Sequence, residues 1–292
     1  MRNLIAILKS PWGISLTLLC CACAGEKEKN TDTGAPPIQP TEVADTVKNT
    51  VSDLVRFKFD FAVANIPSPA EIINDLASYN VNYNSTFEND PQKVGKYTGD
   101  FSKAVNLGIY NLDMAYAIAN NQGADVLRYL KASMTEVDAL GMKPAFDAMV
   151  GKRTETNIGI KDSLLKITDE IYSGADKYLR SNQRVETATC IFVGSWIEAL
   201  HIICKTEDEE KDQIQQVRIQ KHLWDQRFYL KNIIDLLVEF KANKDCEKLM
   251  NDLIEIHSEI NKIEQPSDFN EAKFNSIEAK IGKLRDRLTK GT

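Results

Sequence analysis

From residue 100 to the C-terminus, the sequence carries apolar residues at helical spacing in almost unbroken succession. A period of about 3.6 residues is the primary signal of amphipathic α-helices. In one of the later segments, Ile233, Ile234 and Leu237 share one helix face. The pattern predicts helices at about residues 100–121, 123–140, 144–155, 161–180, 186–205, 209–241, 245–263 and 269–289. We therefore expect an all-α fold, with about eight to ten helices packed as antiparallel hairpins.

The first two of these segments are separated by the turn sequence NNQG and predict an αα-hairpin. The stretch NLDMAYAIANNQGADVLRYLKASM resembles a degenerate tetratricopeptide hairpin, with Leu112, Tyr116 and Leu127 in its packing positions. One such unit is visible, whereas a stable array needs at least about three. The helices are therefore expected to form either a bundle or a short tetratricopeptide-like solenoid.

The sequence before residue 100 is less regular. Residues 43–55 carry valines and leucine at helical spacing, which predicts a first amphipathic helix. The following stretch FKFDFAV, residues 57–63, alternates large apolar residues with polar or small ones and predicts an extended segment laid over the helices. The sequence SPAE at residues 68–71 is a capping box with proline at the first helical position, so a short helix should follow. Asp268 and Glu271 predict a similar start for the last helix.

The N-terminus has the features of an export signal. Arg2 and Lys9 flank a region without acidic residues, and an apolar run follows at residues 12–19. The run is shorter than the roughly 20 residues that span a bilayer. The chain is therefore expected to be exported rather than to cross a membrane at this point.

Three cysteines end this signal within LTLLCCACAGEKEK. The pattern resembles a bacterial lipoprotein signal, in which a cysteine is acylated after cleavage. Ala22 provides the small residue before Cys23, so we expect lipidation at Cys23. Cys21 is the alternative, because Leu18 lies three positions before it. More than one acyl chain on the mature cysteine would give stable membrane anchoring.

These patterns divide the chain into three parts: residues 1–22 as the lipoprotein signal peptide, 23–41 as a flexible acylated tether, and 42–292 as a single helical domain. The tether is rich in Gly, Pro, Thr and charge, and should span roughly 20–25 Å. Ala24 is not the aspartate associated with inner-membrane retention, which favours the outer membrane. Its periplasmic and surface faces remain alternatives.

The mature chain is acidic. Removing residues 1–22 leaves 34 basic residues against 42 acidic ones, a net charge of −8. Without a basic patch, this balance argues against nucleic acid as a partner. Cys190 and Cys204 lie about 21 Å apart along one predicted helix and cannot pair with each other. One of them could pair with Cys246, although we favour buried free thiols.

Three sequence motifs occur in the order NIPSPAEI (residues 65–72), FSKAVNLGIYNLDMAYA (101–117) and GSWIEAL (194–200). Together they resemble a family of all-helical lipoproteins from Bacteroidota, from about residue 50 to the C-terminus. The resemblance implies a helical fold and a lipid anchor, and it brings no catalytic residues with it.

Glu198 and His201 stand three positions apart in the very apolar stretch CIFVGSWIEALHIIC and share one helix face. A Glu-x-x-His pair is half of the ligand set of di-iron bundles, which need a second copy. The other two histidines each have isoleucine at the corresponding position. We therefore favour an ion pair of Glu198 with a basic residue on a neighbouring helix, and keep a metal site as the alternative.

Two groups of aromatic residues are candidates for ligand contacts. The first group, on apolar helical stretches, could line a groove or belong to the core, which is the favoured interpretation: Trp196, Trp224, Phe228 and Tyr229. The second group lies in a polar loop and is either pinned to the core or exposed for recognition: Tyr79, Tyr83 and Phe87.

Motifs for nucleotide binding and zinc hydrolysis are absent from the sequence, and no cofactor is expected. The leading hypothesis is a non-enzymatic, lipid-anchored module that binds another envelope protein or a small ligand through a groove between helical hairpins. The alternative is a metal-binding protein or enzyme using Glu198 and His201. A purely structural envelope component is the third hypothesis.

Overall fold

The computed structural model describes residues 41–65, 67–77, 82–143, 153–154, 156–157 and 159–291. Every element in these ranges is helical, so the predicted all-α fold is confirmed. Val43–Thr292 is one compact unit, and the preceding unit contributes only Thr41 and Glu42 to the described residues. The predicted signal peptide, most of the tether, and the lipidation candidates Cys23 and Cys21 lie outside these ranges.

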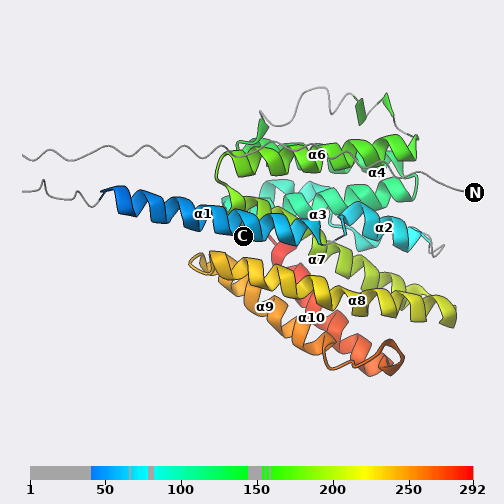
Figure 1. The fold of residues 1–292 in the computed structure, drawn as a ribbon. Coiled ribbons are helices and arrows are strands. Elements are labelled where there is room, and N and C mark those ends of the chain that lie inside the picture. Colours follow the sequence, from blue (N-terminus) through cyan, green and yellow to red (C-terminus); the bar gives the residue numbers. More distant parts are fainter. Residues whose placement is uncertain are drawn as a thin grey trace, which may run out of the picture. The chain divides into compact units, whose positions relative to one another are not determined.

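The α-helices are α1 (Thr41–Ala64), α2 (Pro69–Ala77), α3 (Gly99–Ala119), α4 (Gly123–Ala139), α6 (Lys161–Ser181), α7 (Val185–Glu209), α8 (Gln213–Leu237), α9 (Lys244–Ile260) and α10 (Glu271–Thr289) (Figure 1). Short 3-10 turns lie between them: η1 (Ser85–Phe87), η2 (Pro91–Lys96), η4 (Val238–Phe240) and η5 (Pro266–Asp268). The hairpin predicted at residues 100–140 is present as α3 and α4. The helix predicted at 144–155 falls largely outside the described residues.

The extended segment predicted at residues 57–63 is wrong, because these residues continue α1. The fold buries Phe59 and Ala62, which lie three positions apart on one helix face. Phe57 and Phe61 lie one turn apart on another face and are exposed. The apparent alternation therefore came from aromatic residues on two different faces of a helix. Phe59 is buried, whereas Phe57 and Phe61 are exposed.

The predicted capping box of α2 is confirmed. The Ser68 amide donates to the Glu71 carboxylate at 2.7 Å, and the Glu71 amide donates to the Ser68 hydroxyl at 3.2 Å. The corresponding prediction for α10 is wrong, because Asp268 ends η5 and Asn270 caps the helix. The Asn270 side chain accepts from the Lys273 amide at 3.0 Å. An asparagine is as good an N-cap as an aspartate, which is why Asn270 can take the role that was predicted for Asp268.

Helix α3 lies at the centre of the compact unit. It packs against α2, α4, α6, α7 and α10, and its residues from Ala104 to Ala119 are all buried. In a solenoid each repeat contacts its neighbours along the chain. Contacts of α3 with α7 and α10 join segments far apart in sequence, so the arrangement favours a bundle over a solenoid (Figure 1).

Two glycines let α3 and α7 touch backbone to backbone. A Cβ built on Gly108 would overlap the carbonyl oxygen of Ile191, and one on Gly194 would overlap that of Val105. The Ser195 hydroxyl donates across the contact to the Gly108 carbonyl at 2.8 Å. Gly108 and Gly194 belong to the motifs NLGIYNLDMAYA and GSWIEAL, so these motifs build the central helix crossing.

Helix α7 is the one described helix that is long and apolar enough to span a bilayer by composition. Of its most apolar window, 94% is buried inside the fold. This burial is what a core helix shows when other helices surround it. The apolar composition of α7 is therefore explained by packing against α3, α8 and α10.

Candidate functional site

The predicted ligand-contacting residues on α7 point into the core. Trp196 is 1% exposed, and its indole nitrogen donates to the Gln226 side chain at 3.1 Å. On α8, Trp224 donates to the Ile263 carbonyl at 2.9 Å, whereas Phe228 is 60% exposed. Trp196 therefore has the place of a core side chain with a satisfied polar atom.

Glu198 forms a bidentate ion pair with Arg285 of α10. The Arg285 Nε donates to one carboxylate oxygen at 2.9 Å, and its Nη2 donates to the other at 2.7 Å. Nη2 also donates to the Phe87 carbonyl at 3.2 Å. Glu198 is fully buried and Arg285 is 8% exposed. A buried charge needs such a partner, and the parallel fork of the guanidinium supplies two charge-assisted hydrogen bonds.

A second carboxyl group, that of Asp113 on α3, lies next to this pair and is also fully buried. Burial, followed by the negative charges of Glu198 and Glu88, raises the pKa of Asp113 well above its usual range. Burial alone would raise the pKa of Glu198 as well, but Arg285 outweighs it and holds that pKa below the ordinary value. The raised pKa favours the protonated form of Asp113, and the lowered pKa favours the ionised form of Glu198.

The loop before η2 joins this cluster through Tyr83 and Glu88. The Tyr83 hydroxyl lies 2.7 Å from Glu88 Oε2 and 2.8 Å from Asp125 Oδ2. The Tyr83 hydroxyl has one proton and can donate to only one of these two carboxyl groups. In the other hydrogen bond the hydroxyl oxygen must accept, so that carboxyl group has to be protonated. Burial raises the pKa of Glu88 to about 7, and Asp125 is paired with Arg128, so Glu88 is the carboxyl group that takes up this proton more readily.

The loop aromatics are therefore pinned to the core where the structure describes them. Phe87 is 4% exposed, and the ring of Tyr83 lies 5.1 Å from that of Tyr116. Tyr79 lies outside the described residues. Of the two alternatives for this loop, recognition by exposed aromatics has no support at Tyr83 or Phe87.

His201 lies one helical turn from Glu198 and is 8% exposed. Burial lowers its pKa to about 4, so the imidazole is neutral at physiological pH. A metal ion at this position would have to displace Arg285 from both oxygens of Glu198 and leave a guanidinium uncompensated in the core. Within the described ranges, no three His, Cys, Asp or Glu side chains are grouped as a metal site requires.

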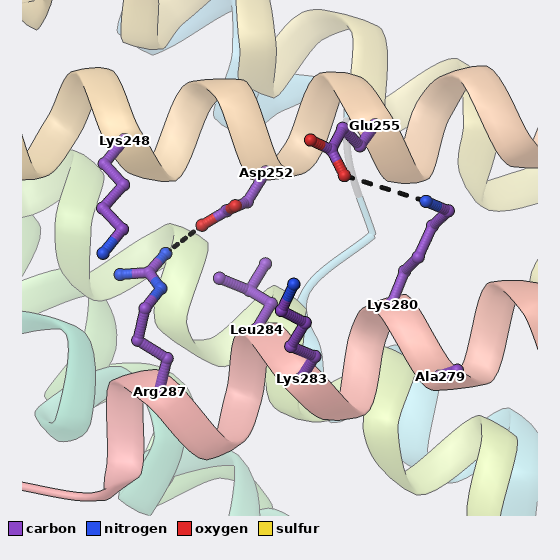
Figure 2. A pocket seen from close by; sticks show the side chains of 8 residues that line it. All are labelled: Lys248, Asp252, Glu255, Ala279, Lys280, Lys283, Leu284 and Arg287. Carbon is purple, nitrogen blue, oxygen red and sulfur yellow. Dashed lines mark hydrogen bonds and ion pairs between the residues drawn. The ribbon is translucent and has the colours of Figure 1, made fainter.

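A groove at the surface, between α9 and α10, offers different chemistry. Its volume is about 540 Å³, within the range of small-molecule sites. The buried side chain of Leu284 lies at its floor, and the rest of the lining is almost entirely charged: Lys248, Asp252, Glu255, Ala279, Lys280, Lys283 and Arg287 (Figure 2). We call this feature the α9–α10 groove.

Four cations face two carboxylates in the α9–α10 groove. Arg287 pairs with Asp252, and the Lys280 ammonium lies 3.7 Å from the Glu255 carboxylate. Lys248 reaches from α9 toward the guanidinium of Arg287 (Figure 2). Lys248 and Lys283 are exposed, and the described part of the chain provides neither with an ion-pair partner. The groove is thus a local excess of positive charge on a chain whose formal net charge is −6.

None of the predicted ligand residues that the structure describes lines this groove. The sequence feature that could have indicated this groove is the helical spacing of its charged residues. Lys280, Lys283 and Arg287 fall on one face of α10, and Lys248 and Glu255 fall on one face of α9. A solvated helix face gives the same spacing, so the pattern becomes informative only when the two faces are seen to oppose each other.

Comparison of the chain with protein-family models, with curated proteins and with solved structures found no match. Its function must therefore be inferred from the geometry of its own residues.

Proposed function

We propose that this chain is a lipid-anchored, non-enzymatic binding module of the outer membrane, which takes an anionic ligand in the α9–α10 groove. The observation that carries the proposal is a pair of lysines, Lys248 on the α9 wall and Lys283 on the α10 wall, that have no ion-pair partner among the described residues. The lipid anchor at Cys23, or at Cys21, and the outer-membrane location rest on the sequence. Either face of that membrane fits.

The contrast between the core and the groove supports binding rather than catalysis. In the core, the ionised Glu198 is bonded to Arg285 on both oxygens and has no open side. In the groove, cations from two helices converge where a ligand can enter. Convergence of like charges is unfavourable, and an anion placed between them removes the repulsion while gaining hydrogen bonds.

The ligand chemistry follows from the cations. Arg287 presents a planar guanidinium and the lysines present rotatable ammonium groups, and all of these recognise carboxylate or phosphate oxygens. Leu284 adds an apolar floor that suits a carbon framework between the anionic groups. An acidic segment of another envelope protein would offer the same carboxylates. The shared requirement is at least two negative groups close together.

Titration calorimetry tests the proposal with three probes: tripolyphosphate, tricarballylate and a short Asp- and Glu-rich peptide. We expect saturable binding of at least one probe, weakening as salt is raised because exposed charges are screened. The double variant Lys248→Gln/Lys283→Gln should lower the affinity at least roughly tenfold, which corresponds to about 1.4 kcal/mol.

The matched control is Lys166→Gln/Lys177→Gln, which removes two exposed lysines from α6 and changes the net charge equally. It should leave binding unchanged. Equal loss in both double variants would mean that only the overall charge matters. Failure of all three probes to bind the wild-type chain would overturn the groove as a ligand site.

The anchor is tested separately by envelope fractionation and intact mass. Acylation adds the mass of the acyl chains to the mature N-terminus and keeps the protein with the membranes. Cys23→Ser should abolish both, and retention of the acyl mass in this variant would assign the anchor to Cys21 instead. If the double variant Cys21→Ser/Cys23→Ser kept both the acyl mass and the membrane association, the proposed lipid anchor would be refuted.

A further inference from the structure

Two buried cysteines meet where α7 and α9 begin. The sulfur atoms of Cys190 and Cys246 lie 3.9 Å apart, and the two side chains are 2% and 0% exposed. A disulfide needs an S–S distance of about 2.05 Å. The thiols are therefore at van der Waals contact, and a bond requires the two sulfur atoms to approach by about 1.85 Å.

The fold holds this pair together through a second contact. The Asn243 side chain caps α9 by accepting from the Asp245 amide at 2.9 Å, and it donates to the Glu186 carboxylate on α7 at 2.6 Å. Cys246 Sγ lies 3.7 Å from the same Glu186 oxygen. Glu186 and Cys190 are one turn apart on α7, so the cap fixes the first turn of α9 against one face of α7.

We propose that Cys190 and Cys246 form an intramolecular disulfide that joins α7 to α9 when the chain meets an oxidising disulfide. This goes beyond the ligand site, which lies on the opposing faces of α9 and α10. It draws on the proposed export of the chain only for the source of the oxidant, because disulfides persist in oxidising compartments. The free-thiol form described above is then the reduced state.

The chemistry requires a disulfide-bearing oxidant, RSSR, of low molecular weight or carried by an oxidoreductase. The thiolate of one cysteine attacks a sulfur of RSSR, forming a mixed disulfide and releasing one RS⁻. The second cysteine then attacks the mixed disulfide and releases the second RS⁻. Two electrons pass to the oxidant, and the two protons from the cysteines end on two RSH.

The bond should form while the chain folds rather than afterwards. In the folded protein both thiols are shielded, and the hydrogen bond with Cys246, together with burial, raises the pKa of Cys190 well above its usual range. The thiolate is the reactive form, so exchange in the folded state is slow in both directions. Once formed, the disulfide would likewise be protected from reductants until the chain unfolds.

The test uses the full chain with Cys20, Cys21 and Cys23 changed to serine, so that only Cys190, Cys204 and Cys246 remain. The protein is refolded in a glutathione redox buffer and, in parallel, in reductant. It is then alkylated under denaturing conditions. We expect one alkylated cysteine, Cys204, after oxidative refolding and three after reductive refolding. Peptide mapping should find Cys190 and Cys246 in one cross-linked peptide.

The cross-link closes a chain segment of 56 residues, and restricting the unfolded state in this way should raise the Tm by roughly 5–10 °C. In the same serine background, Cys246→Ser should lose both the cross-link and the redox dependence of the Tm, whereas Cys204→Ser should keep both. Cys204 is an informative control because it is equally buried. Three alkylated cysteines after oxidative refolding, or a cross-link through Cys204, would overturn the proposal.

Discussion

The close crossing of α3 and α7 predicts that Gly194→Ala is strongly destabilising. On an exposed helix the substitution would gain about 1 kcal/mol, because alanine is a better helix former than glycine. Here the new methyl group would overlap the Val105 carbonyl oxygen, which belongs to the backbone and cannot rotate away. The helices would have to separate by roughly 1 Å, and closely packed side chains around them would lose dispersion contacts.

Overpacking of this kind costs about 1–3 kcal/mol, and more where the obstacle is rigid. After the propensity gain is subtracted, we expect Gly194→Ala to lower the free energy of unfolding by about 2 kcal/mol. Gly282→Ala is the matched control, since Gly282 lies within α10 and a Cβ there meets nothing within 4 Å. The same added methyl should then stabilise by about 0.5–1 kcal/mol.

Urea unfolding followed by circular dichroism measures both variants, with the midpoint compared at an unchanged slope. Both substitutions add one methyl group to a helical glycine. If they change the free energy of unfolding in opposite directions, the difference comes from the contact between α3 and α7 and not from helix propensity. If Gly194→Ala matched Gly282→Ala and raised the midpoint, the backbone contact between α3 and α7 would be refuted.

Three further outcomes follow from the core and the helix ends. Arg285→Met should cost about 3–5 kcal/mol, because it leaves Glu198 charged in the core, and Arg285→Met/Glu198→Met should recover much of this loss in the same urea assay. Glu88 should contribute a loss of stability as pH rises from about 4.5 to 7, because its raised pKa lets the unfolded state ionise first, whereas the buried His201 contributes in the opposite direction. Glu88→Gln should remove the Glu88 contribution and make the denaturation midpoint fall less, or rise more, with pH; an unchanged slope with pH would contradict it. Ser68→Ala should cost about 1 kcal/mol through loss of the cap, measured by the shift in Tm.

The helical periodicity was sufficient to predict most of the fold, because apolar spacing in long segments reports directly on burial. The turn between α3 and α4 and the capping box of α2 were likewise local features of a few residues. The prediction failed at residues 57–63, where exposed Phe57 and Phe61 do not follow the rule that aromatics are buried. A helix with apolar residues on more than one face has no single period to read.

The sites were less predictable, because their residues come together only through tertiary packing. An ion pair of Glu198 with a basic residue on another helix was expected, but its partner on α10 is 87 residues away along the chain. Likewise, no local pattern could show that Lys248 of α9 and Lys283 of α10 line the same α9–α10 groove. The meeting of Cys190 with Cys246 was one of two pairings that the spacing allowed.

The position of Arg285 in the last helix has a consequence for the order in which the chain can mature. During synthesis, a chain that has emerged only as far as α9 already contains Glu198 but lacks the Arg285 guanidinium that pairs with it. The core around α3 and α7 would then enclose the Glu198 carboxylate without its counter-charge, which opposes premature collapse. Formation of α10 supplies the missing charge and closes the core, so the core reaches its stable state only after this helix has been made.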